Sequence, residues 1–192
     1  MDVRSCELSS LHRTHNFGKL SIMQIRQEVF DDRAGIYAVT HAAFSKDDHL
    51  VEPIEVGLVQ RLFDCDAYSP TFSLVATNDK TVIAHVIATW GSVDGKHSLL
   101  GLGPLAVAPE YQNMGAGTAL MQAIADRAEN ERISGIVLLG ATKYYQRFGY
   151  EPAIARGIIP TQPSWGDNFM VRVFDERSLP AGKYRYASPF GC

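Results

Sequence analysis

A glycine-containing turn between an apolar run and a helix-like stretch is the part of this sequence best suited to chemistry. The apolar run covers residues 99–108, the turn residues 112–117 and the helical pattern residues 118–131. The first N–H groups of a helix have no partner within it, and the helix dipole favours negative charge there. Gly115 and Gly117 lack a Cβ, so a phosphate could approach the backbone closely. The spacing is consistent with a pyrophosphate cradle or with an ordinary strand-to-helix loop.

Two common phosphate-binding motifs are excluded. The P-loop pattern GxxxxGKS/T occurs nowhere in the chain. Gly101, Gly103 and Ala106 match the dinucleotide pattern GxGxxA, but they fall inside the apolar run, Pro104 stands between them and no helical pattern begins there. The chain also lacks the G-x-S-x-G nucleophile elbow. The turn at residues 112–117 is therefore the candidate phosphate site.

The elements that position this turn follow from hydrophobic periodicity. Helical spacing comes after Asp31-Asp32, after Pro53 and after the glycine turn. Thr142 is predicted to cap a short helix that Gly149 ends. The expected helices contain residues 36–44, 54–63, 119–131 and 143–148, and the expected strands cover residues 71–77, 81–90, 98–108, 133–139 and 169–174, with a turn at 91–96 and mostly loop after residue 179. This order implies one mixed sheet with helices on its faces.

Composition limits the class of protein. The 192 residues carry 18 basic and 21 acidic side chains and are 46% apolar, which indicates one globular domain without a general basic surface for nucleic acid. Cys6, Cys65 and Cys192 form no zinc motif, so no metal is expected. Charges among the first seven residues argue against a signal peptide, and no apolar run reaches the roughly 20 residues of a membrane helix. We expect a cytoplasmic protein that binds neither membranes nor nucleic acid.

Residues 105–120 resemble the acetyl-coenzyme A signature of the GNAT N-acetyltransferase superfamily, whose core is Q/R-x-x-G-x-G/A. That core is Gln112-Asn113-Met114-Gly115-Ala116-Gly117 in this chain. A second match, residues 144–150, is similar to the family's F-Y-x-x-x-G-F. Residues 137–152 resemble a bacterial subgroup of predicted acetyltransferases with the text LLGDPxYYxRFGF, except that Ala141 and Thr142 replace its Asp-Pro. The resemblance covers about residues 20–175.

The resemblance implies an α+β fold in a single domain. Its central mixed, largely antiparallel sheet would be splayed at the fourth strand and would carry helices on both faces. We expect a loosely ordered extension at residues 1–20, the acetyltransferase domain at residues 21–175 and a C-terminal tail at residues 176–192 packed on or near the domain. The tail and the extension add nothing to the resemblance.

The resemblance also implies transfer of the acetyl group of acetyl-CoA to a primary amine through a tetrahedral intermediate. The splayed strand would contact the cofactor through its backbone, and the glycine turn would hold the pyrophosphate. The cofactor-binding residues would be Leu105, Ala106, Val107, Gln112, Asn113, Met114, Gly115, Ala116, Gly117 and Thr118. An N–H group aimed at the developing oxyanion can contribute a few kcal/mol.

Tyr145 aligns with the tyrosine that many family members use as the general acid toward the leaving thiolate, whereas Tyr144 is expected to face away. No general base is evident. The candidates are Glu52, Glu55, Asp94, His97 and His85, and a water relay or an amine that arrives neutral would need none of them. The chain could therefore be an enzyme, acting on a small-molecule or a peptide or protein amine as a monomer or homodimer, or a non-catalytic acyl-CoA-binding module.

Overall fold

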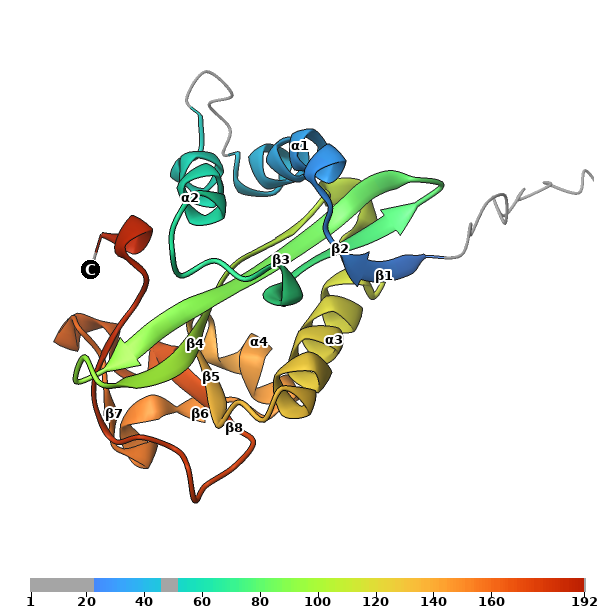
Figure 1. Ribbon diagram of the computed structural model, residues 1–192. Coiled ribbons are helices and arrows are strands. Elements are labelled where there is room, and N and C mark those ends of the chain that lie inside the picture. Colours follow the sequence, from blue (N-terminus) through green and yellow to red (C-terminus); the bar gives the residue numbers. More distant parts are fainter. Residues whose placement is uncertain (1–22, 46–51, 192) are drawn as a thin grey trace, which may run out of the picture.

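The computed structural model describes residues 23–45 and 52–191, which form an open mixed sheet with helices on both faces (Figure 1). The helices are α1 (Arg33–Phe44), α2 (Ile54–Phe63), α3 (Ala116–Asn130) and α4 (Thr142–Tyr145). The strands are β1 (Gln24–Gln27), β2 (Ser73–Asn78), β3 (Thr81–Val93), β4 (His97–Val107), β5 (Gly135–Leu139), β6 (Glu151–Pro152), β7 (Ile158–Ile159), β8 (Phe169–Val173) and β9 (Gly182–Arg185). The extension expected at residues 1–20 lies outside the described residues.

The strand order is β1-β2-β3-β4-β5-β8-β6, and β9 pairs with both β3 and β7. The β4–β5 and β7–β9 pairs are parallel, and every other described pair is antiparallel. The predicted α+β class, with a mixed and largely antiparallel sheet, is confirmed. The helix α3 forms the long crossover that a parallel β4–β5 pair requires.

The sheet splays at β4. Residues Leu100–Leu102 pair with β5, and the pairing stops there. The ladder between β3 and β4 is irregular at the same place, where Val86 pairs with Leu105 but Ala88 pairs with Leu102. Gly103 and Pro104 occupy this irregularity, and a proline cannot donate to a ladder. The second half of β4 therefore runs beside β3 alone, with its other edge open.

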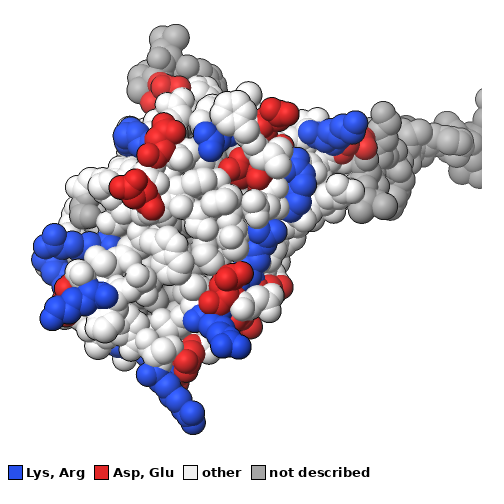
Figure 2. Space-filling view, viewed as in Figure 1, with Lys and Arg blue, Asp and Glu red and all other residues white. Residues whose placement is uncertain are grey.

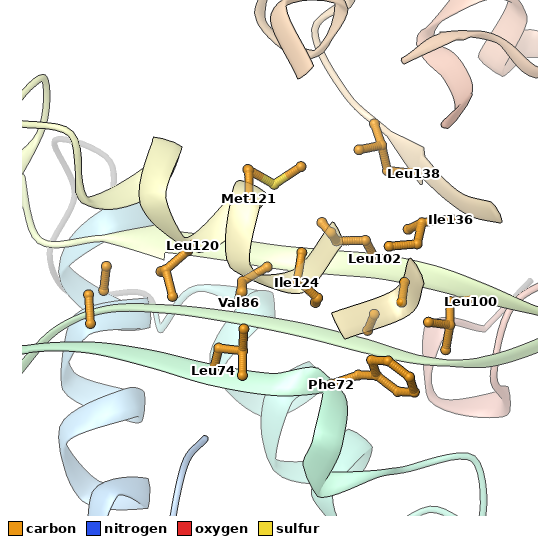
Figure 3. Close-up of a cluster of buried hydrophobic side chains, with 14 of the residues drawn as sticks. Phe72, Leu74, Val86, Leu100, Leu102, Leu120, Met121, Ile124, Ile136 and Leu138 are labelled. Atoms are coloured by element: carbon orange, nitrogen blue, oxygen red, sulfur yellow. The ribbon is translucent and has the colours of Figure 1, made fainter. Parts of the chain in front are cut away.

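The larger part of the core lies between the sheet and α3 (Figure 3). The apolar stripe of α3, Leu120, Ile124 and Ala128, recurs at the four-residue spacing of one helix face and is fully buried. It packs on Leu74 of β2 and on Leu102 of β4, among other strand residues. This packing fixes the start of α3, and hence the glycine turn, against the open half of β4.

The helices α1 and α2 cover the opposite face of the same strands (Figure 1). The α1 residues Ile36 and Val39 pack with Val59 and Leu62 of α2, all nearly or fully buried. They cover Ala106 of β4, together with Val75 of β2 and Ile87 of β3. The second half of β4 thus has one face sealed by helices and one face turned toward α3.

The C-terminal tail differs from the prediction of mostly loop. Residues Gly182–Arg185 form β9, which pairs with Ser92 and Val93, so β3 continues through half of the expected turn at 91–96. Tyr184 is fully buried against Gly91 and Gly101, which have no side chains to exclude it. The last 3-10 helix, Ser188–Phe190, then packs near α2, where Figure 1 places the C-terminus.

The predicted cap of α4 is also wrong. Ala141 is the N-cap, and the Thr142 hydroxyl instead bonds the Asn168 side chain at 3.0 Å. The predicted end of this segment is confirmed, because Gly149 adopts a left-handed conformation (φ 79°) after the 3-10 helix Gln146–Phe148. A single turn of helix, followed by this stop, sets the position of both tyrosines.

Candidate active site

A cavity of about 510 Å³ opens between the free half of β4, the glycine turn and α4. Its lining joins four separate parts of the sequence. The lining residues are Ala43, Phe44, Leu105, Val107, Gln112, Asn113, Gly115, Gly117, Thr118, Tyr144, Tyr145 and Arg147. The structure thus brings most of the predicted cofactor residues, and Tyr145, around one space.

The glycine turn has the backbone conformation of an anion cradle. Gly115, at the N-cap of α3, is left-handed (φ 96°), and Asn113 also has a positive φ of 60°. The Gln112 side chain donates to the Val107 carbonyl at 3.1 Å, which ties the turn back to β4. Within the described residues, no hydrogen bond engages the backbone N–H groups from Asn113 through Thr118. These donors remain available at the positive end of the helix dipole.

Gly117 allows the start of α3 to approach its neighbours. A Cβ at this position would lie 3.1 Å from the Tyr144 hydroxyl and 3.4 Å from Val107 Cγ2. Gly117 is buried although it borders the cavity. A larger side chain would displace the Tyr144 hydroxyl or fill the cradle.

Three residues of β4 were predicted to bind the cofactor, and two of them, Leu105 and Val107, face the open edge of the strand. The Ala108 N–H donates to the Ile83 carbonyl at 2.9 Å, and hydrogen-bonded and non-hydrogen-bonded pairs alternate along an antiparallel ladder. The register then places Ala106 in a hydrogen-bonded pair with His85. Leu105 and Val107 turn their N–H groups away from β3, toward the side that β5 leaves free. Both residues line the cavity, and Ala106 does not.

Two residues of the predicted turn also lie off the cavity lining. Met114 is 60% exposed. Ala116 is the first residue of α3, and its side chain is buried in the core between α3 and the sheet. Only their backbone N–H groups can serve a ligand in the turn. Gln112, Asn113, Gly115, Gly117 and Thr118 line the cavity, as expected for a cradle.

Tyr145 lies at the wall of the cavity with its ring against Gly140. A Cβ on Gly140 would be 2.2 Å from Tyr145 Cε2, so this glycine provides the space for the ring. The ring also packs edge-to-face on Tyr144 and on Tyr150, with centroids 4.9 Å and 6.0 Å apart. Burial, with a smaller effect of Tyr144, raises the pKa of Tyr145 to about 12. The hydroxyl is therefore protonated at neutral pH and can donate.

Tyr144 and Arg147 belong to the cavity as well. The prediction that Tyr144 faces away is wrong, because adjacent helix residues point only about 100° apart and the cavity wall spans both. Arg147 follows three residues later, within the matched segment 144–150. Ala43 and Phe44 lie at the end of α1 and also line the cavity. Their apolar spacing in the sequence indicated packing in the core and gave no sign of a cavity.

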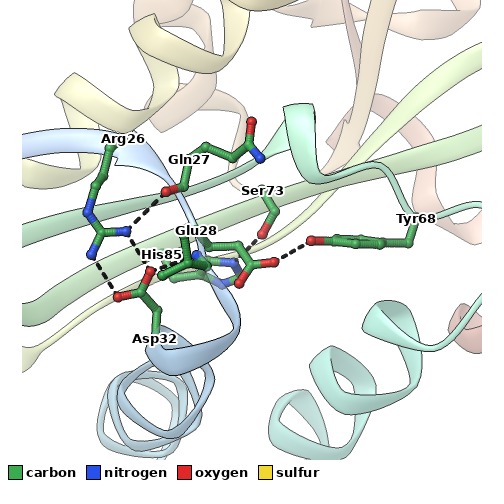
Figure 4. A network of polar contacts seen from close by, with 8 residues as sticks. Arg26, Gln27, Glu28, Asp32, Tyr68, Ser73 and His85 are labelled. Atoms are coloured by element: carbon green, nitrogen blue, oxygen red, sulfur yellow. Dashed lines mark hydrogen bonds and ion pairs between the residues drawn. The ribbon is translucent and has the colours of Figure 1, made fainter.

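None of the five candidate bases lines this cavity. His97 is eight residues before Leu105 on β4, roughly 25 Å along the strand. Asp94 accepts from the Lys183 N–H at 2.9 Å and serves the β3–β9 connection. His85 lies under α1 and α2, fully buried, with Nε2 3.1 Å from the Ser73 hydroxyl (Figure 4). Glu52 and Glu55 flank the start of α2.

Burial lowers the pKa of His85 to about 3, so its imidazole is neutral in the folded protein. Across residues 23–45 and 52–191, no cluster of three or more His, Cys, Asp or Glu could hold a metal ion. In the same residues no helix has the length and apolar character to cross a membrane. On the face shown in Figure 2, Lys and Arg lie interspersed with Asp and Glu.

The similarity to known proteins includes β4, the glycine turn and α4. Residues 33–150 match the family model described as acetyltransferase (GNAT) family. The chain is 33% identical to the uncharacterized N-acetyltransferase YhbS of Escherichia coli K12 over 159 residues, which cover 82% of this chain and 90% of that protein. It is 32% identical over 101 residues to the uncharacterized N-acetyltransferase YjhQ of the same strain, covering 51% of this chain and 56% of that protein.

Two solved structures are similar at higher coverage. The crystal structure of Escherichia coli YhbS in complex with CoA superposes with a TM-score of 0.75 at 28% identity, covering 88% of this chain and 92% of that one. A GNAT family acetyltransferase from Brucella melitensis in complex with acetyl-CoA gives a TM-score of 0.70 at 29% identity, covering 88% and 99%. The sheet splayed at β4, the glycine turn and these matches agree: the chain belongs to the GNAT family of N-acetyltransferases, which are acyltransferase enzymes.

Proposed function

We propose that this protein transfers the acetyl group of acetyl-CoA to a primary amine at the cavity between β4, the glycine turn and α4. One observation carries the proposal. The open edge of β4, the unengaged N–H groups of the turn and the Tyr145 hydroxyl-bearing ring all border the same space. The CoA and acetyl-CoA bound to the two similar structures support the choice of donor.

The residues fit the two ends of that donor. The pyrophosphate would lie over the N–H groups of residues 113–118, where the helix dipole adds favourable potential. The pantetheine arm is an extended amide chain, and it would pair with Leu105 and Val107 as an additional strand pairs with a sheet edge. Leu105 and Val107 can be plain aliphatic residues because their backbones make these contacts.

The reaction would proceed by direct attack. The amine nitrogen forms a bond to the thioester carbon, and the carbonyl oxygen becomes an oxyanion within reach of the β4 N–H groups. The tetrahedral intermediate then collapses: the carbon–sulfur bond breaks and the thiolate leaves. Tyr145, whose hydroxyl is protonated at neutral pH, donates a hydrogen bond or its proton to that sulfur. The amide nitrogen releases its extra proton to water.

Among the residues that the structure describes, the cavity lining contains no carboxylate or imidazole that could take the amine proton. This observation favours an amine that reaches the site already neutral. It is also compatible with a second function, in which the protein binds acyl-CoA without turnover. The two differ in one property, because only the enzyme releases free thiol in proportion to an added amine.

The first experiment is a thermal-shift assay with acetyl-CoA, CoA and ATP in parallel. A ligand at 100 times its dissociation constant adds about 2.7 kcal/mol of stability, a rise of roughly 5–10 °C for a domain of this size. Stabilisation by both CoA species but not by ATP is expected. The absence of a shift with millimolar CoA or acetyl-CoA would overturn the proposal.

The second experiment measures thiol release from acetyl-CoA across a panel of small amines, amino acids and lysine peptides. Release that depends on at least one amine is expected for the enzyme. Binding of acetyl-CoA with no amine-dependent release from any member of the panel would favour the binding module instead.

A further inference from the structure

We propose that Arg147 binds the 3′-phosphate of coenzyme A, and that Tyr144 positions it. This inference rests on the proposed function, since it assigns a contact to the same donor. CoA carries a pyrophosphate and a separate phosphate monoester on its ribose. The N–H groups of the glycine turn can bind the pyrophosphate. The 3′-phosphate then needs another binding group at the cavity.

Arg147 is the residue at the cavity with the required charge. Among the described lining residues it alone has a charged side chain, and none of them carries a carboxylate. Within residues 23–45 and 52–191, Arg147 takes part in no ion pair. The arginines that do form ion pairs in the structure are Arg26, Arg156 and Arg172. A guanidinium without a carboxylate, at the edge of a cavity with an anion cradle, is available for phosphate.

The Arg147 side chain is held in place by Tyr144 of α4 and by its neighbour Phe148. Its Nε donates to the Tyr144 carbonyl at 3.2 Å, and its guanidinium carbon lies 4.5 Å from the Tyr144 ring centroid and 5.3 Å from that of Phe148. These contacts include one hydrogen bond, from Nε, and none from the terminal nitrogens. The terminal nitrogens keep the paired donors that match two oxygens of a phosphate.

Tyr144 links this arginine to the cradle. Its ring supports the guanidinium, and its hydroxyl lies over Gly117 at the start of α3. Tyr144 therefore sets the separation between the two phosphate-binding groups. Neither residue touches the reacting thioester in this assignment. Both therefore affect the affinity for the cofactor and do not affect the rate of the chemical step.

The test compares CoA with dephospho-CoA, which lacks only the 3′-phosphate, by isothermal titration calorimetry. Wild-type protein should bind CoA about tenfold more tightly, as expected for a charge-assisted hydrogen-bonded pair. Arg147→Gln should reduce that preference to about twofold or less while its affinity for dephospho-CoA stays within a factor of two. Unchanged binding of dephospho-CoA also shows that the variant is folded.

Lys143→Gln is the matched control, because it removes one positive charge four residues before Arg147, at an exposed position in α4 that does not line the cavity. It should keep the wild-type preference for CoA. Equal loss of preference in the two variants would indicate a general charge effect and would overturn the assignment to Arg147. Wild-type protein that binds both ligands equally would overturn it as well, with the proposed function intact; wild-type protein that binds neither would instead overturn the proposed function.

Discussion

Two polar regions on opposite faces of the sheet differ in how completely their charges are paired. In the cavity beside α3 and α4, a series of backbone N–H groups and the Arg147 guanidinium meet no acidic partner among residues 23–45 and 52–191. Under α1, by contrast, Arg26 forms two bonds with Asp32, and the Tyr68 hydroxyl donates to Glu28 (Figure 4). The second region is a network in which most polar groups bond one another within the chain, although among the described residues Glu28 Oε2 and His85 Nδ1 have no hydrogen-bond partner.

The two regions are separated by the thickness of the sheet at β4. His85, in the network, pairs with Ala106, while Leu105 and Val107 on either side of Ala106 turn toward the cavity. Polar groups that the chain leaves unpaired at a cavity indicate a ligand, whereas polar groups paired within the chain indicate stability. Changes in the cavity should therefore affect binding and turnover, and changes in the network should affect the free energy of unfolding.

The largest effect is expected for Tyr145→Phe. Loss of the hydroxyl removes the proton or hydrogen bond to the leaving sulfur, and kcat should fall about 100-fold or more. The affinity for acetyl-CoA should stay within a factor of two, because the ring and its packing on Gly140 remain. Thiol release with the best amine of the panel gives kcat, and calorimetry gives the affinity.

Tyr144→Phe is the adjacent control. It removes a hydroxyl that borders Gly117 without reaching the thioester in the proposed arrangement. The apparent KM for acetyl-CoA should rise severalfold with kcat unchanged. Equal kcat in the wild type and Tyr145→Phe, or a loss of kcat in Tyr144→Phe as large as in Tyr145→Phe, would argue against the specific role of Tyr145.

Gly117→Leu should abolish tight binding of acetyl-CoA. A Cβ at this position already lies 3.1 Å from the Tyr144 hydroxyl, so the additional carbons must enter the cradle. Overpacking of this kind costs about 1–3 kcal/mol, and steric exclusion of the pyrophosphate should bring the loss of affinity to about 100-fold. Isothermal titration measures the loss.

Gly57→Leu in α2 is the matched control, since among the described residues its Cβ would meet only the flexible end of Arg61, on the other face of the sheet. It should bind acetyl-CoA as the wild type does. A Gly117→Leu protein that is folded by circular dichroism and keeps wild-type affinity would show that the turn is not the cradle.

His85→Gln should change the response to acid without changing cofactor affinity. Burial lowers the pKa of His85 in the folded state to about 3, against 6.5 for an ordinary histidine. Below pH 6.5 the unfolded chain therefore binds a proton at this histidine that the folded chain does not bind. The free energy of unfolding keeps its full value above pH 6.5 and declines as the pH falls toward 3. Linkage gives a loss of about 2 kcal/mol between pH 7 and pH 5 from this group.

Urea unfolding at pH 7 and pH 5 measures this difference. Glutamine cannot take up the proton, so the variant should lose about 2 kcal/mol less than the wild type over that interval. His97→Gln removes an exposed imidazole at the start of β4 and should retain the wild-type loss. Identical losses in wild type and His85→Gln would contradict the assignment of this acid response to His85.

The sequence allowed the glycine turn and the helix after it to be predicted because their signals are local. Gly115 and Gly117 mark the turn, and the apolar stripe after them marks α3, within one short segment. The fold class followed from the order of such segments together with the family resemblance. The prediction that Tyr144 faces away failed because α4 is a single turn, whose position relative to the cavity depends on packing against Gly117 and Gly140.

The strand β9 could not be predicted because its partners are distant in the sequence. It pairs with Ser92 and Val93, about 90 residues earlier, and the prolines and glycines around it are typical of loop. Arg147 lay within a segment whose text was matched, but an arginine next to a helix end is ordinarily solvent-exposed. Only the structure, which brings the end of α1 and the segment after α4 to one cavity, shows that this one borders a cavity.

The smallest effect is expected at the exposed edge of the network, for Arg26→Gln. The Arg26 side chain is 39% exposed while Asp32 is 8% exposed, so solvent screens part of their attraction. Asp32 keeps the Val29 N–H at 2.8 Å after the change. We therefore expect a loss of about 1 kcal/mol in the free energy of unfolding at pH 7, with no change in acetyl-CoA affinity.

The pH dependence of that loss identifies its origin. The hydrogen bonds from Arg26, together with that from Val29, hold the pKa of Asp32 below its ordinary value. The stabilisation is therefore present above about pH 4 and disappears as Asp32 is protonated at lower pH. Urea unfolding of wild type and Arg26→Gln at pH 7 should differ, and the difference should shrink below pH 4. A difference that persists unchanged at pH 3, or a change in acetyl-CoA affinity at pH 7, would contradict the separation of the two regions.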